Sequence, residues 1–469
     1  MTAIASTGEA PAPSLGAAGV MVLSLAALDF GLEQSLIIPA LPALAEHYGA
    51  SLQAVAWMVT GFVLASIVAI PLVSRLGDMV GKRRMLLASL TAFALGSLLC
   101  ALAETSGLAI AGRVVQGVGA AVAPLTYGLV RDNVAADRMP RAIGGVVGGA
   151  SAGAAIGFLL SGVLVDGFAV TAIFWFLFAF AVAIAIALLA LVPESQIRAD
   201  VRFDVVGAAL LGVGLFALLL AISKGSAWGW TSGRTVATMS TALALLVGFV
   251  LAESRTPEPL VHPGLVVRPP FGSANLCAFV FGYAFFIAVF TLPLIAAAPE
   301  STGYGLELGT IGIGLLLLPT GVASLAGGLA GGHLIARVGP RPLVAAGASL
   351  GVIGYAVLAL APSAVATLAA GSGAIGLAWG LILTGVASVV VIGAAPQSTA
   401  VAVAVNAVTR NTAVAIGAQV AFALIADAGL ADGHPAESGY TAVFVMGGAA
   451  ASLLLVAARF MPARAARAR

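Results

Sequence analysis

The segment SRLGDMVGKRR, residues 74–84, joins two long apolar runs near residues 54–73 and 85–103. A helix needs about 20 mainly apolar residues to cross the hydrocarbon of a membrane, and each flanking run has that length. The two glycines of the segment allow a tight connection, and Asp78 can cap the N-terminal end of the helix that follows. Its three adjacent bases hold a loop on the cytoplasmic side. The segment therefore predicts two membrane-spanning helices joined by a cytoplasmic loop.

The same pattern extends over the whole chain, which contains fourteen apolar runs bounded by charges, glycine, proline or polar turns. The runs lie near residues 17–42, 54–73, 85–103, 108–130, 143–165, 172–192, 206–223, 235–252, 273–296, 309–335, 342–361, 365–393, 401–426 and 440–459. They are too long for barrel strands and lack an alternation of period two. The pattern predicts an all-α membrane protein in which six, two and six helices follow one another.

The distribution of basic residues predicts the orientation of these helices. If the N-terminus is cytoplasmic, 17 of the 21 Lys and Arg residues lie in cytoplasmic loops or in the tail. Lys224 and Arg234 then lie outside, and Arg113 and Arg410 lie within spans. This asymmetry favours an even number of spans, with both termini on the cytoplasmic side of the inner or plasma membrane of the cell.

Polar joints between the runs predict the domain boundaries. Segments 193–204 and 253–270 interrupt the apolar pattern, and the second carries five prolines, as linkers do. The expected parts are an N-terminal cytoplasmic segment, an N-terminal six-helix bundle, a linker with two accessory transmembrane helices, a C-terminal six-helix bundle and a cytoplasmic tail, at residues 1–16, 17–192, 193–272, 273–459 and 460–469. No loop is long enough for a soluble domain, so the function is expected in or across the bilayer.

The composition excludes several classes of protein. Charged residues make up 9% of the chain, against about 25% in soluble proteins. The net charge of +2 comes without a basic tract, so no nucleic-acid partner is expected. Cys100 and Cys277 lie in separate runs and the four histidines are scattered, so neither a disulfide nor a metal site is predicted. No phosphate-binding loop is present, and neither a cofactor nor an enzyme activity is expected.

Four ionisable residues lie within the apolar runs, where each costs about 2.5–3.5 kcal/mol. They are Asp29, Glu33, Arg113 and Arg410. The two acids are one helical turn apart on the same face, and Arg113 lies about 8 Å from the outer end of its span. Glu33 and Arg113 are therefore expected to meet at a similar depth, with Gln34 and Gln116 as hydrogen-bonding neighbours.

Two acids near one arginine favour a site that carries protons. Low dielectric disfavours the charged carboxylate and a nearby arginine favours it, so an acid that approaches and leaves Arg113 can bind and release a proton. Alternatively, the acids only neutralise Arg113 and brace two spans. Arg410 either belongs to a site in the second half or, near the inner end of its span, extends to the membrane surface or caps helix ends. Cavity lining, interface anchoring and lipid contact are equal alternatives for Trp57, Phe174, Trp175 and Tyr283.

Residues 74–84 resemble the loop signature Gly-x-Leu-Ala-Asp-x-x-Gly-Arg-Arg of the major facilitator superfamily, with Ser74 in place of the first glycine. The resemblance implies an inner gate that contains an ion pair. The residues that the resemblance assigns to this gate are Asp78, Gly81, Lys82, Arg83 and Asp132. A weaker copy at residues 332–341 has Ala336 in place of the acid. Two copies at corresponding places imply the two pseudo-symmetric six-helix bundles of the major facilitator fold.

Two further stretches are similar to signatures of this superfamily. Arg113 begins Arg-Val-Val-Gln-Gly, which resembles the span 4 signature, whose arginine is associated with proton transfer. Gly149, Gly153 and Gly157 form a small-residue ridge for close helix packing and resemble the span 5 signature of antiporters. Two other positions depart from that signature, so symport stays open besides antiport, and the ridge is also explained by packing alone.

The chain as a whole resembles the fourteen-span drug:proton antiporters. The matching residues are Leu28 with Asp29, residues 40–42, 228–232 and 258–260, and Asn406 with Arg410. The resemblance implies a proton-coupled secondary transporter that exports small amphipathic or cationic compounds, such as drugs and antibiotics, by alternating access. A metabolite transporter of the same fold is the alternative. The expected partners are a small-molecule substrate, protons and the lipid bilayer, the energy source is the proton gradient, and the chain is expected to be monomeric.

Overall fold

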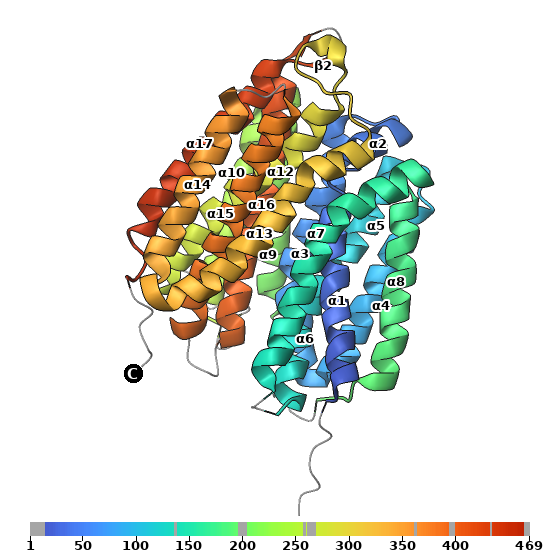
Figure 1. The fold of residues 1–469 in the computed structure, drawn as a ribbon, viewed down its shortest axis with the longest axis vertical. Helices are drawn as coiled ribbons and strands as arrows, with labels where there is room; N and C mark the ends of the chain where they lie inside the picture. Colours follow the sequence, from blue (N-terminus) through green and yellow to red (C-terminus); the bar gives the residue numbers. More distant parts are fainter. Residues whose placement is uncertain are drawn as a thin grey trace, which may run out of the picture.

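The computed structural model in Figure 1 describes residues 15–135, 138–195, 204–256, 259, 269–360, 364–393, 399–431 and 434–463. Fourteen helical spans in this part of the chain are long and apolar enough to cross a membrane. This confirms the predicted all-α membrane architecture with fourteen spans.

The N-terminal bundle contains the helices up to residue 191. They are α1 (Ala17–Leu36), α2 (Leu41–His47), α3 (Leu52–Val80), α4 (Lys82–Ala101), α5 (Ser106–Val118), the 3-10 turn η1 (Gly119–Ala121), α6 (Val122–Asn133), α7 (Met139–Gly167) and α8 (Ala172–Leu191). Helix α1 packs against α7 and α8, and α4 packs against α5 and α8. Their facing leucine, isoleucine and phenylalanine side chains form the core of this bundle.

The C-terminal bundle repeats this arrangement from residue 271 onward. Its elements are α12 (Phe271–Ala297), the 3-10 turn η2 (Glu300–Thr302), α13 (Thr310–Val338), α14 (Pro340–Leu360), α15 (Val365–Gly393), α16 (Thr399–Asp427), the strands β1 (Leu430–Ala431) and β2 (His434–Pro435), and α17 (Glu437–Ala458). Helices α13, α14 and α15 pack side by side, and α12 packs against α16 and α17. The short strands form an antiparallel hairpin.

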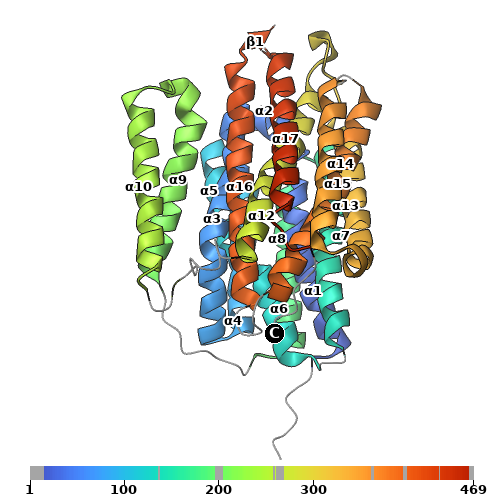
Figure 2. The same ribbon diagram turned by 90° about the vertical axis from the view of Figure 1, so that its left-hand side faces the viewer.

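Two accessory helices, α9 (Val205–Trp228) and α10 (Gly233–Glu253), lie beside the bundles in Figure 2. Helix α9 contacts α3 of the first bundle and α16 of the second, while α10 packs on α9. The indole nitrogen of Trp57 on α3 donates a 2.9 Å hydrogen bond to the hydroxyl of Ser223 on α9. The pair therefore lies along the seam between the bundles, outside the central space.

The connection between α3 and α4 is shorter than predicted, because Gly81 alone links them at a φ of +130°. Asp78 lies in the last turn of α3, so the expectation that it caps α4 is wrong. Glu194 caps α4 instead, since its carboxylate accepts hydrogen bonds from the backbone amides of Arg83 (2.9 Å) and Arg84 (3.1 Å). A Cβ at position 81 would lie 2.8 Å from that carboxyl group, so the contact requires glycine.

Two other spans differ from the expected runs. The first helix ends at Leu36 instead of residue 42, because residues that precede a proline, as Ile38 does here, avoid helical backbone angles. The fourth span is divided into α5 and α6 by η1. At that turn Gly119 lies against Phe93 of α4, where an added Cβ would be 3.0 Å from the Phe93 side chain.

The two bundles meet most closely at the end where α2 and the β1–β2 hairpin lie, at the top of Figure 1; we call it the hairpin end. Here the C-terminal half of α7 packs against the first half of α13, and α3 packs against α16. The carboxylate of Asp166 accepts a 2.9 Å hydrogen bond from the backbone amide of Ile311, and the amide of Gln419 donates a 2.7 Å bond to the hydroxyl of Thr60. These contacts join the bundles at the hairpin end.

Candidate functional site

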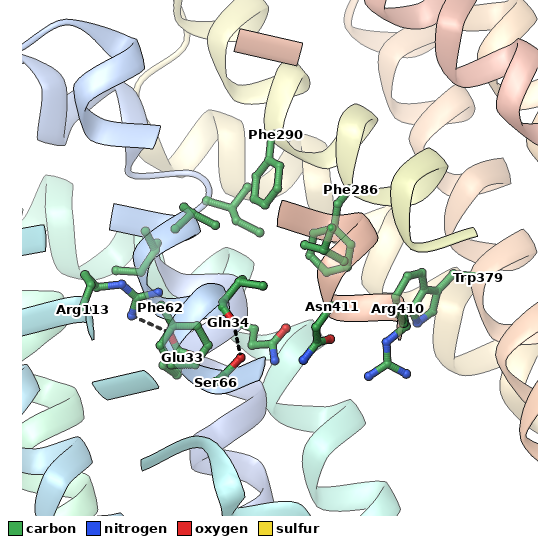
Figure 3. A pocket seen from close by; sticks show the side chains of 15 residues that line it. Glu33, Gln34, Phe62, Ser66, Arg113, Phe286, Phe290, Trp379, Arg410 and Asn411 are labelled. Atoms are coloured by element: carbon green, nitrogen blue, oxygen red, sulfur yellow. Dashed lines mark hydrogen bonds and ion pairs between the residues drawn. The ribbon is translucent and has the colours of Figure 1, made fainter. Parts of the chain in front are cut away.

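A cavity lies between the two bundles, lined by α1, α3 and α5 on one side and by α12, α15 and α16 on the other. It contains about 580 Å³ of space not filled by atoms, including its open mouth. Figure 3 shows Glu33 and Arg113 on one side and Arg410 and Trp379 on the opposite side. The cavity is lined by polar as well as aromatic side chains, as sites for small molecules are.

Glu33 and Arg113 form an ion pair on the wall of this cavity. Both side chains are buried, with 0% and 2% of their surface exposed, so neither faces lipid. The other carboxylate oxygen of Glu33, Oε2, has no hydrogen-bond partner among the described residues. The structure therefore brings together the two residues expected to meet, and leaves one oxygen of the acid open to a proton.

Arg113 is held in place by three further contacts. Its Nε donates a 3.0 Å hydrogen bond to the carbonyl of Met58, and its guanidinium lies 4.6 Å from the centre of the Phe62 ring. A terminal nitrogen donates a 2.7 Å bond to Gln116, whose amide donates a 2.7 Å bond to Ser97 on α4. The position of the guanidinium thus does not depend on Glu33 alone.

Close packing of α4 and α5 makes this network possible. Gly96 of α4 faces the backbone and side chain of Gln116. A Cβ added at position 96 would lie 2.5 Å from the backbone nitrogen of Gln116. Gln116 therefore lies behind Arg113, outside the set of residues that line the cavity, while Gln34 lines the cavity itself.

Asp29 lies one helical turn from Glu33, on the side away from the hairpin end, and is only 2% exposed. Its Oδ1 has no hydrogen-bond partner in the described part of the chain. The residue does not belong to the cavity lining, in contrast to the expectation that both acids face one cavity. Since an ionised carboxylate without partners is costly in a protein interior, this position tolerates the protonated acid at the lowest cost.

The second-half residues separate into two environments. Arg410 lines the cavity 11 residues after the start of α16, far from the end of the helix. Asn406 points elsewhere: its amide donates a 3.0 Å hydrogen bond to Asn275 of α12 and fixes α16 to that helix. Of this pair, Arg410 alone is available to a molecule in the cavity.

The aromatic lining of the cavity differs from the one considered in the sequence. Phe62, Phe286, Phe290 and Trp379 line it. Of the four earlier candidates none is part of this lining as far as the structure describes it, and Trp175 is 44% exposed on the outside of the bundle. The sequence does not show whether a phenylalanine in an apolar run faces the cavity or the lipid, because the packing of the helices determines how each helix is rotated about its axis.

The proposed gate residues lie together at the end opposite the hairpin. The ammonium group of Lys82 is 2.5 Å from a carboxylate oxygen of Asp132 and 3.2 Å from one of Asp78. Ser195 donates a 2.6 Å hydrogen bond to the same Asp132 oxygen. Arg83 follows Lys82 and donates its side-chain hydrogen bond to the carbonyl of Leu189 at the end of α8. Ser195 and the helix-capping Glu194 had no signal in the sequence, since both lie in a polar joint.

The glycine ridge of α7 faces α1. Gly149 lies against the carbonyl of Ser24, Gly153 against that of Leu28, and Gly157 against the hydroxyl of Ser35. Ser35 also donates a 3.3 Å hydrogen bond to the carbonyl of Gly153. The ridge therefore sets the distance between α7 and the helix that carries both acids.

A family model described as the Major Facilitator Superfamily matches residues 23–418 of the chain. The match covers most of the described helices, from α1 to the middle of α16.

Three curated bacterial proteins are similar to the chain. The tetracenomycin C resistance and export protein of Streptomyces glaucescens is 30% identical over 345 residues, 71% of this chain and 61% of that protein. The multidrug resistance protein Stp of Mycobacterium tuberculosis is 28% identical over 86% of this chain and 75% of that protein. The probable actinorhodin transporter of Streptomyces coelicolor is 28% identical over 64% and 52%, respectively. The matched part thus spans less than two thirds of the first and third of these relatives.

Two solved structures share the fold. The human organic anion transporter MFSD10 (TETRAN) superimposes with a TM-score of 0.63 at 16% identity, over 94% of this chain and 99% of that chain. The nucleoside transporter NupG, as a D323A mutant, superimposes with a TM-score of 0.59 at 13% identity, with the same coverage. At this identity the likeness concerns the fold, and the expected major facilitator architecture is confirmed.

Proposed function

The chain belongs to the major facilitator superfamily, and from this premise we propose that it exports small amphipathic compounds across the plasma membrane in exchange for entering protons. The observation that carries the proposal is the Glu33–Arg113 ion pair on the wall of the central cavity. A buried acid whose charge depends on its distance from a fixed cation is a site at which protonation and conformation are linked.

The contacts of Arg113 explain how the ion pair exchanges a proton. When Glu33 takes up a proton, its attraction to Arg113 is lost, but Met58, Gln116 and Phe62 still hold the guanidinium. Glu33 is then free to move with α1. When it returns to Arg113, the ionised form is stabilised and the proton leaves. Protonation of one carboxylate thereby favours a different position of α1 relative to α5.

Asp29 provides a second proton position on the same helix. It is buried without a hydrogen bond to Oδ1, one turn further from the hairpin end than Glu33. If the hairpin end faces the outside, as the distribution of basic residues predicts, a proton that enters at Glu33 passes Asp29 on its way to the cytoplasm. The two acids then form a short relay along α1.

The contacts at the hairpin end support alternating access. Asp166, Ile311, Thr60 and Gln419 join the bundles at this end, so cargo in the cavity is separated from that side of the membrane. Export requires these contacts to break and the opposite ends to close. The cluster around Lys82 and Asp132 lies at those opposite ends, and we assign it the role of an inner gate.

The relatives support the class of cargo. Two of them are named for the export of tetracenomycin C or for multidrug resistance, and a third is a probable actinorhodin transporter. The cavity combines four aromatic side chains with a few polar groups, which suits a compound with an apolar body and polar substituents. We therefore propose drugs or antibiotics of this kind as cargo.

The proposal is tested with the purified protein in proteoliposomes under an imposed pH gradient. Uptake of a panel of fluorescent dyes and antibiotics is recorded for the wild type, for Glu33→Gln, and for Glu104→Gln as a control acid on the exposed loop between α4 and α5. We expect gradient-driven uptake in the wild type and the control, and its loss in Glu33→Gln. Equal uptake by the wild type with and without the pH gradient would refute proton coupling.

A further inference from the structure

Arg410 is the one charged side chain of the cavity lining that the proposed proton exchange does not use. It is half-buried, and no carboxylate of the described residues forms an ion pair with it. Arg113, on the opposite side, has an ion pair with Glu33, two hydrogen bonds and an aromatic ring. The two arginines of the cavity thus differ: the positive charge of Arg113 is compensated by Glu33, while that of Arg410 is compensated by no carboxylate of the described residues.

An uncompensated guanidinium within a membrane protein is costly and calls for a physical reason. Extension to the membrane surface does not explain the charge at this position, because Arg410 lies well inside α16 and faces the cavity. Support of the fold does not explain it either, since Arg410 forms neither an ion pair nor a side-chain hydrogen bond in the described part of the chain. The remaining partner is a molecule that enters the cavity.

The surroundings of Arg410 define the shape of such a molecule. The rings of Trp379 and Phe286 stand almost perpendicular, at 78°, with centres 5.5 Å apart, and Phe290 continues this wall at 5.4 Å from Phe286. Figure 3 shows Arg410 and Asn411 beneath these rings. Aromatic walls of this kind favour flat aromatic bodies, which stack or pack edge to face against them.

The charges of the cavity wall indicate the charge of the molecule that binds there. Arg113 compensates the negative charge of Glu33, and Asp29 does not belong to the cavity lining, so the charge left uncompensated on the wall is positive. A cation in this space would meet Arg410 without a free carboxylate on the wall to bind it. An anion would give Arg410 the charge-assisted hydrogen bonds that the protein does not provide.

We propose that Arg410 binds the negatively charged group of a planar aromatic substrate, with Asn411 as a further hydrogen-bonding group and the Trp379–Phe286 wall against its rings. The substrate class is an aromatic carboxylate or phenolate. This class differs from the cationic compounds that the family resemblance implies. The inference deepens the proposed export function and rests on it for the role of the cavity.

Equilibrium binding to the purified full-length protein tests the inference without any gradient. The probes are anthracene-9-carboxylate, anthracene-9-methanol and anthracene-9-methylammonium, which share one ring system and differ in charge. The proteins are the wild type, Arg410→Gln, Arg410→Lys and, as a control, Arg234→Gln, whose side chain is exposed near the start of α10. Folding of each variant is checked by its melting temperature and elution volume.

We expect the wild type to bind the carboxylate at least about 10-fold more tightly than the ammonium probe, because hydrogen bonds to charged groups contribute to this extent. Arg410→Gln should lose that preference while its affinity for the neutral alcohol changes little. Arg410→Lys should keep much of it, and Arg234→Gln all of it. Equal affinities of the wild type for the anion and the cation would overturn the inference, as would an equal loss for all three probes in a folded Arg410→Gln.

The outcome is separable from that of the proposed function. If the carboxylate binds through Arg410 but no compound is moved by a pH gradient, proton-coupled export is refuted and the binding site stands. If the gradient drives uptake of cations alone and the carboxylate does not bind, the assignment of Arg410 is refuted and proton-coupled export stands.

Discussion

Glu33 and Asp29 are four residues apart on α1, yet their surroundings differ. Glu33 has a cationic partner and lines the cavity, while the Asp29 carboxyl is buried away from the lining. Under the proposed function, the charge of Glu33 depends on both Arg113 and the contents of the cavity. Asp29 then provides a position for a proton when Glu33 is ionised. Two acids with different surroundings can divide the uptake and release of one proton between them.

The role of Asp29 is tested by Asp29→Asn, which keeps the size of the side chain and removes its ability to carry a proton. We expect this variant to insert into the membrane and fold, but to lose transport driven by a pH gradient. Uptake in proteoliposomes measures the transport, and the yield of monodisperse protein measures folding. Full retention of transport would show that Asp29 carries no essential proton.

The sequence was informative about these acids and about Arg113, because a charge within an apolar run is conspicuous. It was not informative about Trp379 and Phe286. The chain contains 21 phenylalanines, nearly all in apolar surroundings, and which of them face the centre depends on the packing of helices far apart in the sequence. For the same reason Arg410 could be found in the sequence but not placed in the cavity.

Among the elements, α7 contacts both bundles. One of its faces packs against α1 of its own bundle, and the other packs against α13 of the second bundle. The glycine ridge faces α1, whereas Phe158 and Gly162 face Gly314 and Ile311 of α13. The helix thus links the position of the two acids to the contact that joins the bundles. The ridge was visible in the sequence as a repeat of four residues, but the helix it faces was not.

This packing is tested by Gly153→Ala with Gly148→Ala as its matched control on the same helix. An added Cβ at position 153 would meet the backbone of Leu28 and Leu32, while position 148 is open. We expect the first variant to lose about 1–3 kcal/mol of stability, as overpacked sites do, and the second to lose none. Melting curves of the purified variants supply the comparison. Identical melting temperatures would mean that α1 and α7 are not packed as described.

The ends of the helices, unlike their existence, could not be predicted from the apolar pattern of the sequence. Apolar length predicted every span, but the ends depend on single residues such as Gly81 and on partners such as Glu194, which lies more than a hundred residues away. The domain boundaries at residues 192 and 273 stay a prediction, since parts of both joints fall outside the described residues. The same holds for residues 258–260 of the family resemblance and for most of the two termini.

For the molecule as a whole, the contacts at the hairpin end imply that a transport cycle must separate α7 from α13 and α3 from α16. The pH dependence of such a cycle is not expected to come from Tyr48, just beyond α2. Burial, with a smaller contribution from Cys100, raises the pKa of this phenol to about 12, so it stays protonated in assays near neutral pH.

Rocking of the bundles is tested by a disulfide across their contact. The Cβ of Ala155 on α7 lies 3.2 Å from the place of a Cβ at position 321 on α13. A small outward shift brings the pair into the Cβ–Cβ range of a disulfide, about 3.5–4.5 Å. In a chain whose two native cysteines are replaced by alanine, oxidation of Ala155→Cys with Gly321→Cys should stop transport, and a reductant should restore it.

The matched control joins two helices of one bundle. Gly351→Cys with Ala451→Cys links α14 to α17, where the corresponding separation is 3.4 Å. Oxidation of this pair should leave transport unchanged, because rocking of the bundles requires no movement of α14 relative to α17. Transport that continues after complete cross-linking of residues 155 and 321 would exclude separation of α7 from α13 as a step of the cycle.

The most direct test of the central claim is the proton flux that a cargo gradient drives in the absence of any imposed pH difference. Proteoliposomes that contain a pH-sensitive dye are loaded with a transported compound and diluted, for the wild type and for Glu33→Gln. We predict that outflow of the compound acidifies the wild-type vesicles, and that Glu33→Gln still exchanges labelled for unlabelled compound but moves no protons. Acidification of equal size in Glu33→Gln would contradict the account.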